Sequence, residues 1–178
     1  QNLYATRNVN IAGTLTAGDE NGFGATFYVG KIHKNVLLDS LSCDFAGANE
    51  VVASSPVGIG KCVRLTADSY IHAQNTDWRK ERIGYYYCFS VWIYAEEVGS
   101  VRFYQDEHLI GDIVIDQAER WLRHKVSFPV RQSDAPNMSL GISSEVPLIV
   151  TAPQLEAGKQ PTPYQATDGT LNYTEEYG

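Results

Sequence analysis

The hydrophobic pattern is strongest in residues 85–94, a run of ten residues without glycine, proline, acid, amide or base. Aromatic and β-branched side chains dominate it, which is typical of a central β-strand covered on both faces. Side chains alternate across a sheet. One set is apolar and is expected to face the core: Tyr85, Tyr87, Phe89, Val91 and Ile93. The other set mixes polar tips with flat rings, which fits either the floor of a sugar-binding groove or a partly covered second face: Tyr86, Cys88, Ser90, Trp92 and Tyr94.

Shorter segments with strand-like patterns lie on both sides of this run. Before it they are residues 35–39, 51–53, 61–67 and 69–73. After it they recur at the spacing of a β-sandwich, at residues 100–105, 109–115, 120–129, 138–143 and 148–155. Residues 116–119 are expected to add a short helical turn. The predicted fold class is all-β, with two antiparallel sheets packed as a β-sandwich.

The two ends of the chain differ from this central body. Residues 8–18 alternate apolar and polar side chains in one short ribbon. Such a ribbon needs a partner to bury its apolar stripe, either the following domain or the same segment of neighbouring chains. We expect an extended N-terminal segment or linker at 1–32, with a fibre-like or oligomerisation role. One domain at 33–166 and a C-terminal tail at 167–178 complete the expected organisation. Because the chain begins with Gln1, we expect a fragment, a processed product or one segment of a longer polypeptide.

Composition narrows the function classes. With 178 residues, 43% hydrophobic and 20% charged, the chain can bury one sizeable core. A net charge of −7 argues against nucleic acid as a partner, because phosphate binding needs surplus lysine and arginine. No run approaches the ~20 apolar residues of a membrane span, so no membrane insertion is expected. Three cysteines without CxxC spacing are expected to be buried thiols, with one disulfide bond among them as the alternative.

Several segments resemble the carbohydrate-binding-module type of jelly roll, found attached to glycoside hydrolases and within phage tail and virion proteins. They are Asn35–Leu38, Gly60–Ala67, Tyr87–Trp92, Arg120–Arg123, and Ala152–Gly158 with Thr162–Tyr164. The last resembles the closing Pro-Gln-Leu-Glu-x-Gly-x-x-x-Thr-x-Tyr of phage-encoded members. Residues 8–16 resemble repeats of phage tail-fibre shafts, in which three chains intertwine. The resemblance implies a jelly roll over residues 35–166 and a virion or extracellular location. Two features depart from the pattern, since no tryptophan follows Leu38 and Cys88 replaces a small polar residue.

Catalysis is not expected. Glycoside hydrolysis needs two positioned carboxylates in different environments. Apart from Glu156, the candidate acids fall in turns or at exposed positions of the pattern, and no pair is predicted to converge: Glu96, Glu97, Asp106, Glu107, Asp112, Asp116, Glu119 and Glu145. Glu156 is interpreted as structural, holding the connection after the last strand through backbone hydrogen bonds. The four histidines lack metal-ligand spacing and no Gly-x-Ser-x-Gly motif is present.

Sugar binding is better supported, because pyranose faces stack on aromatic rings and planar polar groups fix hydroxyls. The candidate glycan-binding residues are Trp78, Tyr86, Trp92, Tyr94, Arg102 and Tyr104. Gln105, Asn75 and Arg123 are candidate polar partners. Trp121 is interpreted as a core tryptophan, whereas core and ligand roles stay open for Trp92 and Tyr94.

A structural role is the third hypothesis: a fibre or decoration domain whose rings connect copies. Tyr164, Tyr173 and Tyr177 would then contact a neighbour, and a homotrimer is expected. Asp39, Asp44 or Asp168 are the candidate oxygen donors if a structural calcium is present, although no loop has a recognisable ligand spacing; no other cofactor is expected. The sequence thus predicts a non-enzymatic virion protein, tail fibre or capsid decoration, that acts in attachment to surface carbohydrate or in particle decoration. A carbohydrate-binding module of a bacterial glycoside hydrolase is the alternative.

Overall fold

The computed structural model describes residues 35–37, 39–65, 68–72, 83–132 and 138–169. The N-terminal segment 1–32, Trp78, Asn75 and most of the expected tail lie outside the described residues. Nine β-strands occur in the described ranges: β1 (Asn49–Val51), β2 (Cys62–Leu65), β3 (Ser69–His72), β4 (Tyr86–Ala95), β5 (Gly99–Gln105), β6 (His108–Ile115), β7 (Trp121–Pro129), β8 (Ser139–Ser144) and β9 (Leu148–Ala157). No helix long and apolar enough to cross a membrane occurs in this part of the chain.

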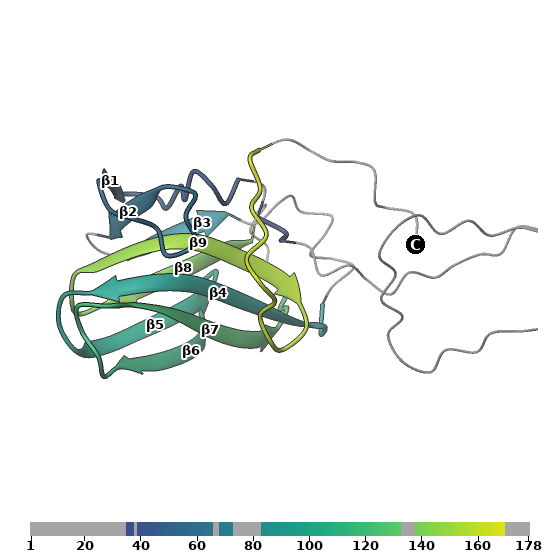
Figure 1. Ribbon diagram of the computed structural model, residues 1–178. Coiled ribbons are helices and arrows are strands. Elements are labelled where there is room, and N and C mark those ends of the chain that lie inside the picture. Colours follow the sequence, from purple (N-terminus) through teal and green to yellow (C-terminus); the bar gives the residue numbers. More distant parts are fainter. Residues whose placement is uncertain (1–34, 38, 66–67, 73–82, 133–137, 170–178) are drawn as a thin grey trace, which may run out of the picture. The chain divides into compact units, whose positions relative to one another are not determined.

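The strands form two antiparallel sheets. The five-stranded sheet has the order β1-β2-β9-β4-β7, and the four-stranded sheet has the order β3-β8-β5-β6. Figure 1 shows them as two layers, with β9, β4 and β7 in one and β8, β5 and β6 in the other. The fold is an all-β, two-sheet jelly roll, which confirms the predicted class. The five strands after β4 lie within two residues of their expected bounds.

The core lies between the two sheets, and β4 contributes to it as its alternation predicts. Tyr87, Phe89, Val91 and Ile93 are each at most 4% exposed. The ring of Phe89 meets that of Phe103 from β5 edge to face, with centroids 6.1 Å apart. The prediction was wrong for Tyr85, which is 59% exposed because the strand begins one residue later.

Strand β9 contains a β-bulge that reverses the direction of its side chains. Ser90 pairs with Gln154 and Trp92 with Thr151, so Ala152 and Pro153 together oppose Val91 alone. Ala152 has a φ of 51°, in the left-handed region, and Pro153 has no backbone N–H to donate to the sheet. Before the bulge, even-numbered residues such as Val150 face the core. After it, odd-numbered Leu155 does, so Gln154 and Glu156 point away from the sandwich.

Two expected elements differ in the structure. Residues 35–37 do not form a strand, and residue 38 lies outside the described residues. The Asn35 amide makes the hydrogen bonds that a sheet partner would make: Oδ1 accepts from the N–H of Leu37 and Leu155, and Nδ2 donates to the Pro153 carbonyl at 3.2 Å. The helical turn expected at 116–119 is absent from these described residues, since Glu119 has a φ of 58° and its N–H donates to the Ala95 carbonyl.

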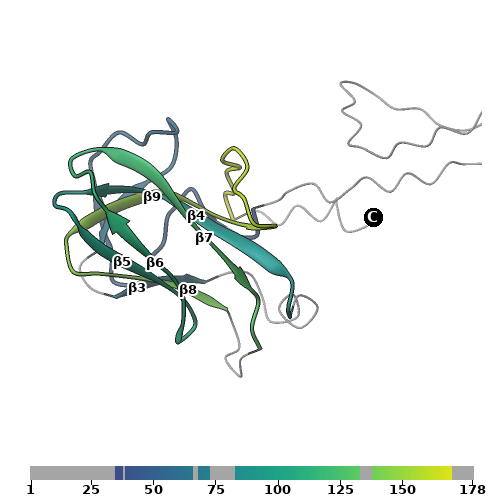
Figure 2. The same ribbon diagram turned by 90° about the horizontal axis from the view of Figure 1, so that it is seen from below.

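The chain after β9 folds back onto the five-stranded sheet. We call residues 158–169 the C-terminal segment; Figure 2 shows it in yellow beyond the end of β9. The Leu41 N–H donates to the Thr167 carbonyl at 3.0 Å, and the Tyr164 and Ser40 hydroxyls lie 2.8 Å apart. The described body therefore continues through Thr167.

The three cysteines are buried free thiols, which confirms that interpretation and not the disulfide alternative. Burial raises the pKa of Cys88 to about 11, and the Glu156 charge contributes to the rise. Burial also raises the pKa of Cys43 far above its ordinary value. Neither thiol is set up as a nucleophile, because thiolate reactivity needs a lowered pKa.

Candidate functional site

The candidate glycan residues are divided between the two outer faces of the sandwich. Face A is the outer face of the five-stranded sheet, and face B is that of the four-stranded sheet. Since Phe89 and Phe103 meet in the core, alternate residues of β4 and β5 point to opposite sides of the molecule. Tyr86, Trp92 and Tyr94 therefore lie on face A, whereas Arg102 and Tyr104 lie on face B. These five described residues do not form one site.

Part of face A is covered by the C-terminal segment. Glu156 accepts the Thr162 N–H at 3.0 and 3.1 Å through its two carboxylate oxygens, and Gln154 Nε2 donates to the same carboxylate. Gln154 Oε1 accepts the Gln165 N–H at 2.7 Å, and Arg123 donates to the Thr162 carbonyl and the Ser90 hydroxyl. Gln154 and Glu156 are completely buried by this cover. The geometry agrees with the structural interpretation of Glu156.

Face A also carries three half-buried rings: Trp92, Tyr94 and Trp121. Tyr94 pairs across the strands with Trp121, with ring centroids 5.7 Å apart and planes at 59°. Trp92 pairs with Arg123 in the next row, and its buried indole N–H has no acceptor among the described residues. The core interpretation of Trp121 was wrong, because Trp121 faces outward beside Tyr94; strand register decides this and the local pattern does not. Burial lowers the pKa of Arg123, an effect that the nearby Glu156 partly offsets.

Face B presents two tyrosines on either side of a glycine. The register places Tyr70 of β3 and Tyr104 of β5 opposite the same residue of β8, Gly141, and Leu109 of β6 continues the row. A Cβ at position 141 would lie 3.3 Å from the Tyr104 Cβ and 3.8 Å from its ring Cδ2, so the Tyr104 ring leans over the glycine. Tyr70 is 45% exposed. We call Tyr70, Gly141 and Tyr104 the tyrosine platform.

Polar groups adjoin the tyrosine platform. Arg102 pairs with Ser143 of β8 and Asp112 of β6, and its Nε lies 3.9 Å from the Asp112 carboxylate. Arg102 and Asp112 are exposed, so their hydrogen-bonding groups remain available to a ligand. Gln105, an expected polar partner, is instead buried, and its amide bonds the backbone of Arg131.

The sequence did not single out Tyr70 and Gly141. Tyr70 falls in a segment that the sequence predicts to be a strand, and the alternation of side chains along that strand allows an outward position for Tyr70. Nothing in the local pattern shows that β3 and β5 both flank β8, so the partnership of Tyr70 with Tyr104 could not be found.

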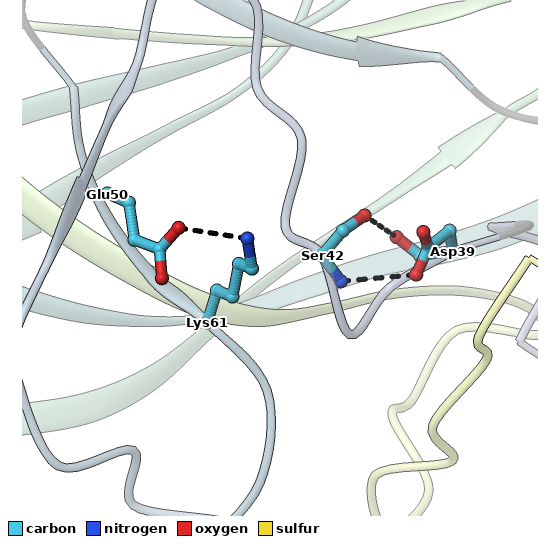
Figure 3. A network of polar contacts seen from close by, with 4 residues as sticks. All are labelled: Asp39, Ser42, Glu50 and Lys61. Atoms are coloured by element: carbon cyan, nitrogen blue, oxygen red, sulfur yellow. Dashed lines mark hydrogen bonds and ion pairs between the residues drawn. The ribbon is translucent and has the colours of Figure 1, made fainter.

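Two small cavities lie away from the platform. One, of about 330 Å³, is at the β2 and β8–β9 end and is lined by Arg64, Leu65, Ile142, Ser144, Glu145, Val146 and Pro147. The other, of about 140 Å³, adjoins the polar contacts of Figure 3, where Lys61 pairs with Glu50 at 2.9 Å and Ser42 bonds Asp39. Of the proposed calcium donors, Asp44 lines this cavity. Within the described ranges, no three acidic, histidine or cysteine residues are grouped so that they could hold a metal.

The described acids include one fully buried carboxylate, Glu156. Both of its oxygens accept the backbone N–H of Thr162, so the side chain is occupied in fastening the C-terminal segment. A catalytic pair needs two carboxylates facing a common ligand. The structure assigns Glu156 a fastening role.

No protein-family model and no curated protein matches this chain. The fold is similar to that of solved carbohydrate-binding modules. One, a family 6 module of lichenase 5A from Cellvibrio mixtus solved with cellotriose, is 14% identical with a TM-score of 0.47, and the alignment covers 72% of this chain and 100% of that one. The C-terminal family 6 module of the laminarinase LamC from Zobellia galactanivorans is 10% identical with a TM-score of 0.48, covering 70% and 99%.

A phage protein has a related fold. The tripod of the baseplate of bacteriophage Tuc2009 is 15% identical with a TM-score of 0.45, and the alignment covers 76% of this chain and 59% of that one. These likenesses concern the fold, and at such identities a ligand is not transferred from one protein to another.

Proposed function

We propose that this protein is a non-catalytic carbohydrate-binding module whose glycan lies on the tyrosine platform of face B. The observation that carries the proposal is the placement of Tyr70 and Tyr104 on either side of Gly141. Sugars offer weakly apolar CH faces that stack on aromatic rings, surrounded by hydroxyls that need polar partners. The platform supplies the rings and the adjoining row supplies the polar groups.

The dimensions of the platform suit a sugar ring. Neighbouring strands lie about 4.8 Å apart, so Tyr70 and Tyr104, with β8 between them, are separated by roughly 10 Å at the backbone. Gly141 contributes no side chain to the floor between them, and the Tyr104 ring leans across it. A pyranose stacked on Tyr104 would have Tyr70 at its edge.

Hydroxyl recognition would come from the next row of residues. Arg102 donates hydrogen bonds, Asp112 accepts them and Ser143 can do either. The Arg102–Asp112 contact of 3.9 Å is long and exposed, so little interaction energy is lost when each group turns to a ligand. The two opposite charges suit an uncharged glycan.

We also propose an extracellular setting, in which the module attaches a virion protein to surface carbohydrate. This is supported by the resemblance of residues 152–164 to the closing motif of phage-encoded members. A homotrimer through residues 1–32 is part of the same proposal. A module of a bacterial glycoside hydrolase is the second candidate, favoured by the likeness of the fold to such modules. Sequencing the DNA on either side of the codons for residues 1–178 distinguishes the two candidates. A catalytic domain encoded in the same reading frame contradicts the virion setting.

Affinity electrophoresis in gels that contain neutral polysaccharides tests the binding proposal. The protein should be retarded by at least one neutral glycan, and Tyr104→Ala or Tyr70→Ala should weaken that binding about tenfold. Tyr86→Ala is the matched control, because Tyr86 is as exposed as Tyr70 but lies on face A. Equal binding by all three variants, or no retardation across a broad panel, would contradict the proposal.

A further inference from the structure

Face A carries a row of cations beside aromatic rings, although the whole chain has a net charge of −7. Along β7, the outward positions are Trp121, Arg123 and Lys125, which are spaced about 7 Å apart because every second residue faces the same side. Lys159 of the C-terminal segment and Tyr86 of β4 adjoin them. We call these five residues, together with Tyr94, the basic aromatic stripe.

The two lysines of the stripe are bound by groups other than carboxylates. Lys125 Nζ donates to the Lys159 carbonyl at 3.3 Å and to the Gln160 side chain, and Lys159 Nζ lies 4.1 Å from the centroid of the Tyr86 ring. Within the described part of the chain, no carboxylate forms an ion pair with Lys125 or Lys159. Both ammonium groups belong to exposed residues.

Three of the other described surface cations, by contrast, contact a carboxylate. Lys61 pairs with Glu50 at 2.9 Å, Arg64 with Glu96 at 2.7 Å, and Arg102 contacts Asp112 at 3.9 Å. Those charges are neutralised locally. The charge of the buried Glu156, on the same face, partly offsets that of Arg123, which leaves Lys125 and Lys159 as the uncompensated positive charges of the stripe.

We propose that the basic aromatic stripe is a second ligand site that binds an acidic glycan, a sugar polymer with carboxylate groups. Its sugar rings would stack on Trp121 and Tyr94, whose planes meet at 59°, while Lys125 and Lys159 pair with the carboxylates. Charge complementarity selects this ligand over a neutral one, because uncompensated cations on an acidic protein attract anions locally. The site is on the opposite outer face from the tyrosine platform and does not depend on it.

Polygalacturonate and its fully methyl-esterified form test this site, because esterification removes the charge and keeps the sugar chain. We expect calorimetric binding of polygalacturonate, and no comparable binding of the ester. Raising the salt from about 20 mM to about 300 mM should weaken the interaction, since exposed charges are screened. Lys125→Gln combined with Lys159→Gln should lower the affinity about fivefold or more. Trp121→Ala should lower it as well.

Two controls separate this proposal from the first. Lys61→Gln removes a cation outside the stripe and should leave polygalacturonate binding unchanged. Tyr104→Ala should also leave it unchanged, even if neutral glycan binding is lost. Equal binding of the ester, or unchanged binding in the double lysine variant, overturns the acidic-glycan site whatever happens on face B. Equally tight binding of a single-stranded oligonucleotide overturns it too, because attraction to any polyanion would then suffice.

Discussion

Both outer faces of this sandwich carry aromatic and charged side chains, but the C-terminal segment covers part of face A alone among the described residues. On face A, the C-terminal segment buries Gln154 and Glu156 and leaves a stripe of rings and cations beside it. On face B, no described segment buries Tyr70, which stays 45% exposed. The difference arises from the path of the chain after β9. In this fold, that path decides how much of each face remains open to a ligand.

The C-terminal segment is held at one place on face A because β9 presents polar side chains outward. Gln154 and Glu156 recognise the backbone of residues 162 and 165, and Asn35 holds the Gln165 carbonyl at 3.0 Å. On face B, the outward side chains of Arg102 and Asp112 contact each other, and neither binds the backbone of a described segment. The outward polar residues of β9 thus stabilise the fold, whereas Arg102 and Asp112 on face B remain available to a ligand.

Glu156→Ala should produce the largest effect, because it loosens the C-terminal segment that distinguishes face A from face B. Loss of the carboxylate leaves the half-buried Thr162 N–H without its acceptor and removes one acceptor of the buried Gln154 amide, at a cost of about 2–3 kcal/mol in the free energy of unfolding. Urea denaturation measures it, and limited proteolysis should cut the released C-terminal segment. Glu96→Ala is the control, because its exposed ion pair with Arg64 contributes less than about 1 kcal/mol. Equal losses in the two variants would show that the cover is not held by Glu156.

Tyr164→Phe should destabilise the same cover by a smaller amount. The change removes the hydroxyl that lies 2.8 Å from the Ser40 hydroxyl, and one such hydrogen bond contributes about 1 kcal/mol. Tyr104→Phe on face B should change stability by less than about 0.5 kcal/mol. Thermal or urea unfolding of both variants measures the difference, and a larger loss for Tyr104→Phe would reverse the comparison of the faces.

His124 of β7 should add a modest pH dependence to stability. Burial lowers its pKa below the ordinary 6.5, an effect that Asp116 partly offsets. The unfolded chain therefore takes up a proton before the folded one does. The stabilising contribution is full above pH 6.5 and is lost as the pH falls through the lower pKa of the folded state.

The His124→Gln variant isolates this contribution from the carboxylates that titrate at lower pH. Urea unfolding between about pH 7 and about pH 5 should show a shallower fall in stability for the variant than for the wild type. Parallel pH profiles would exclude His124 as the source.

Gly141→Ala should give the smallest effect, a lower affinity for neutral glycan without a loss of stability. The added methyl would lie 3.3 Å from the Tyr104 Cβ, so the ring must shift by a few tenths of an ångström. Neutral glycan affinity should fall less than in Tyr104→Ala, with stability little changed. Ser127→Ala is the control, because Ser127 is exposed on face A, away from the tyrosine platform. Unchanged affinity in Gly141→Ala would show that the ring position does not matter.

Much of the fold could be predicted from local pattern. The run around Phe89 has the composition of a central strand, and the strands after it follow turns that the sequence marks clearly. Glu156 could be interpreted as structural because it lies in a polar motif at the end of the last strand. These features depend on neighbouring residues, which a single sequence displays.

The candidate site depended on pairing, which the sequence does not display. Tyr94 and Tyr104 have the same outward parity, yet they belong to different sheets and point in opposite directions. Trp121 looks apolar enough for the core, but its register with Tyr94 places it outside. Gln105 looks like a surface polar residue, but its alternation with Tyr104 directs it inward, where the backbone of Arg131 satisfies its amide.

The bulge at Ala152 and Pro153 decides both which side chains of β9 enter the core and whether the C-terminal segment is held on face A. Deleting one of these residues would bring Leu155 to the outside and send Glu156 into the apolar interior. The same deletion would unfasten the C-terminal segment and place a charge among hydrocarbon side chains. A shortened β9 is therefore incompatible with the present closing motif, so an engineer who grafts this body onto another scaffold must transfer strand and motif as one unit.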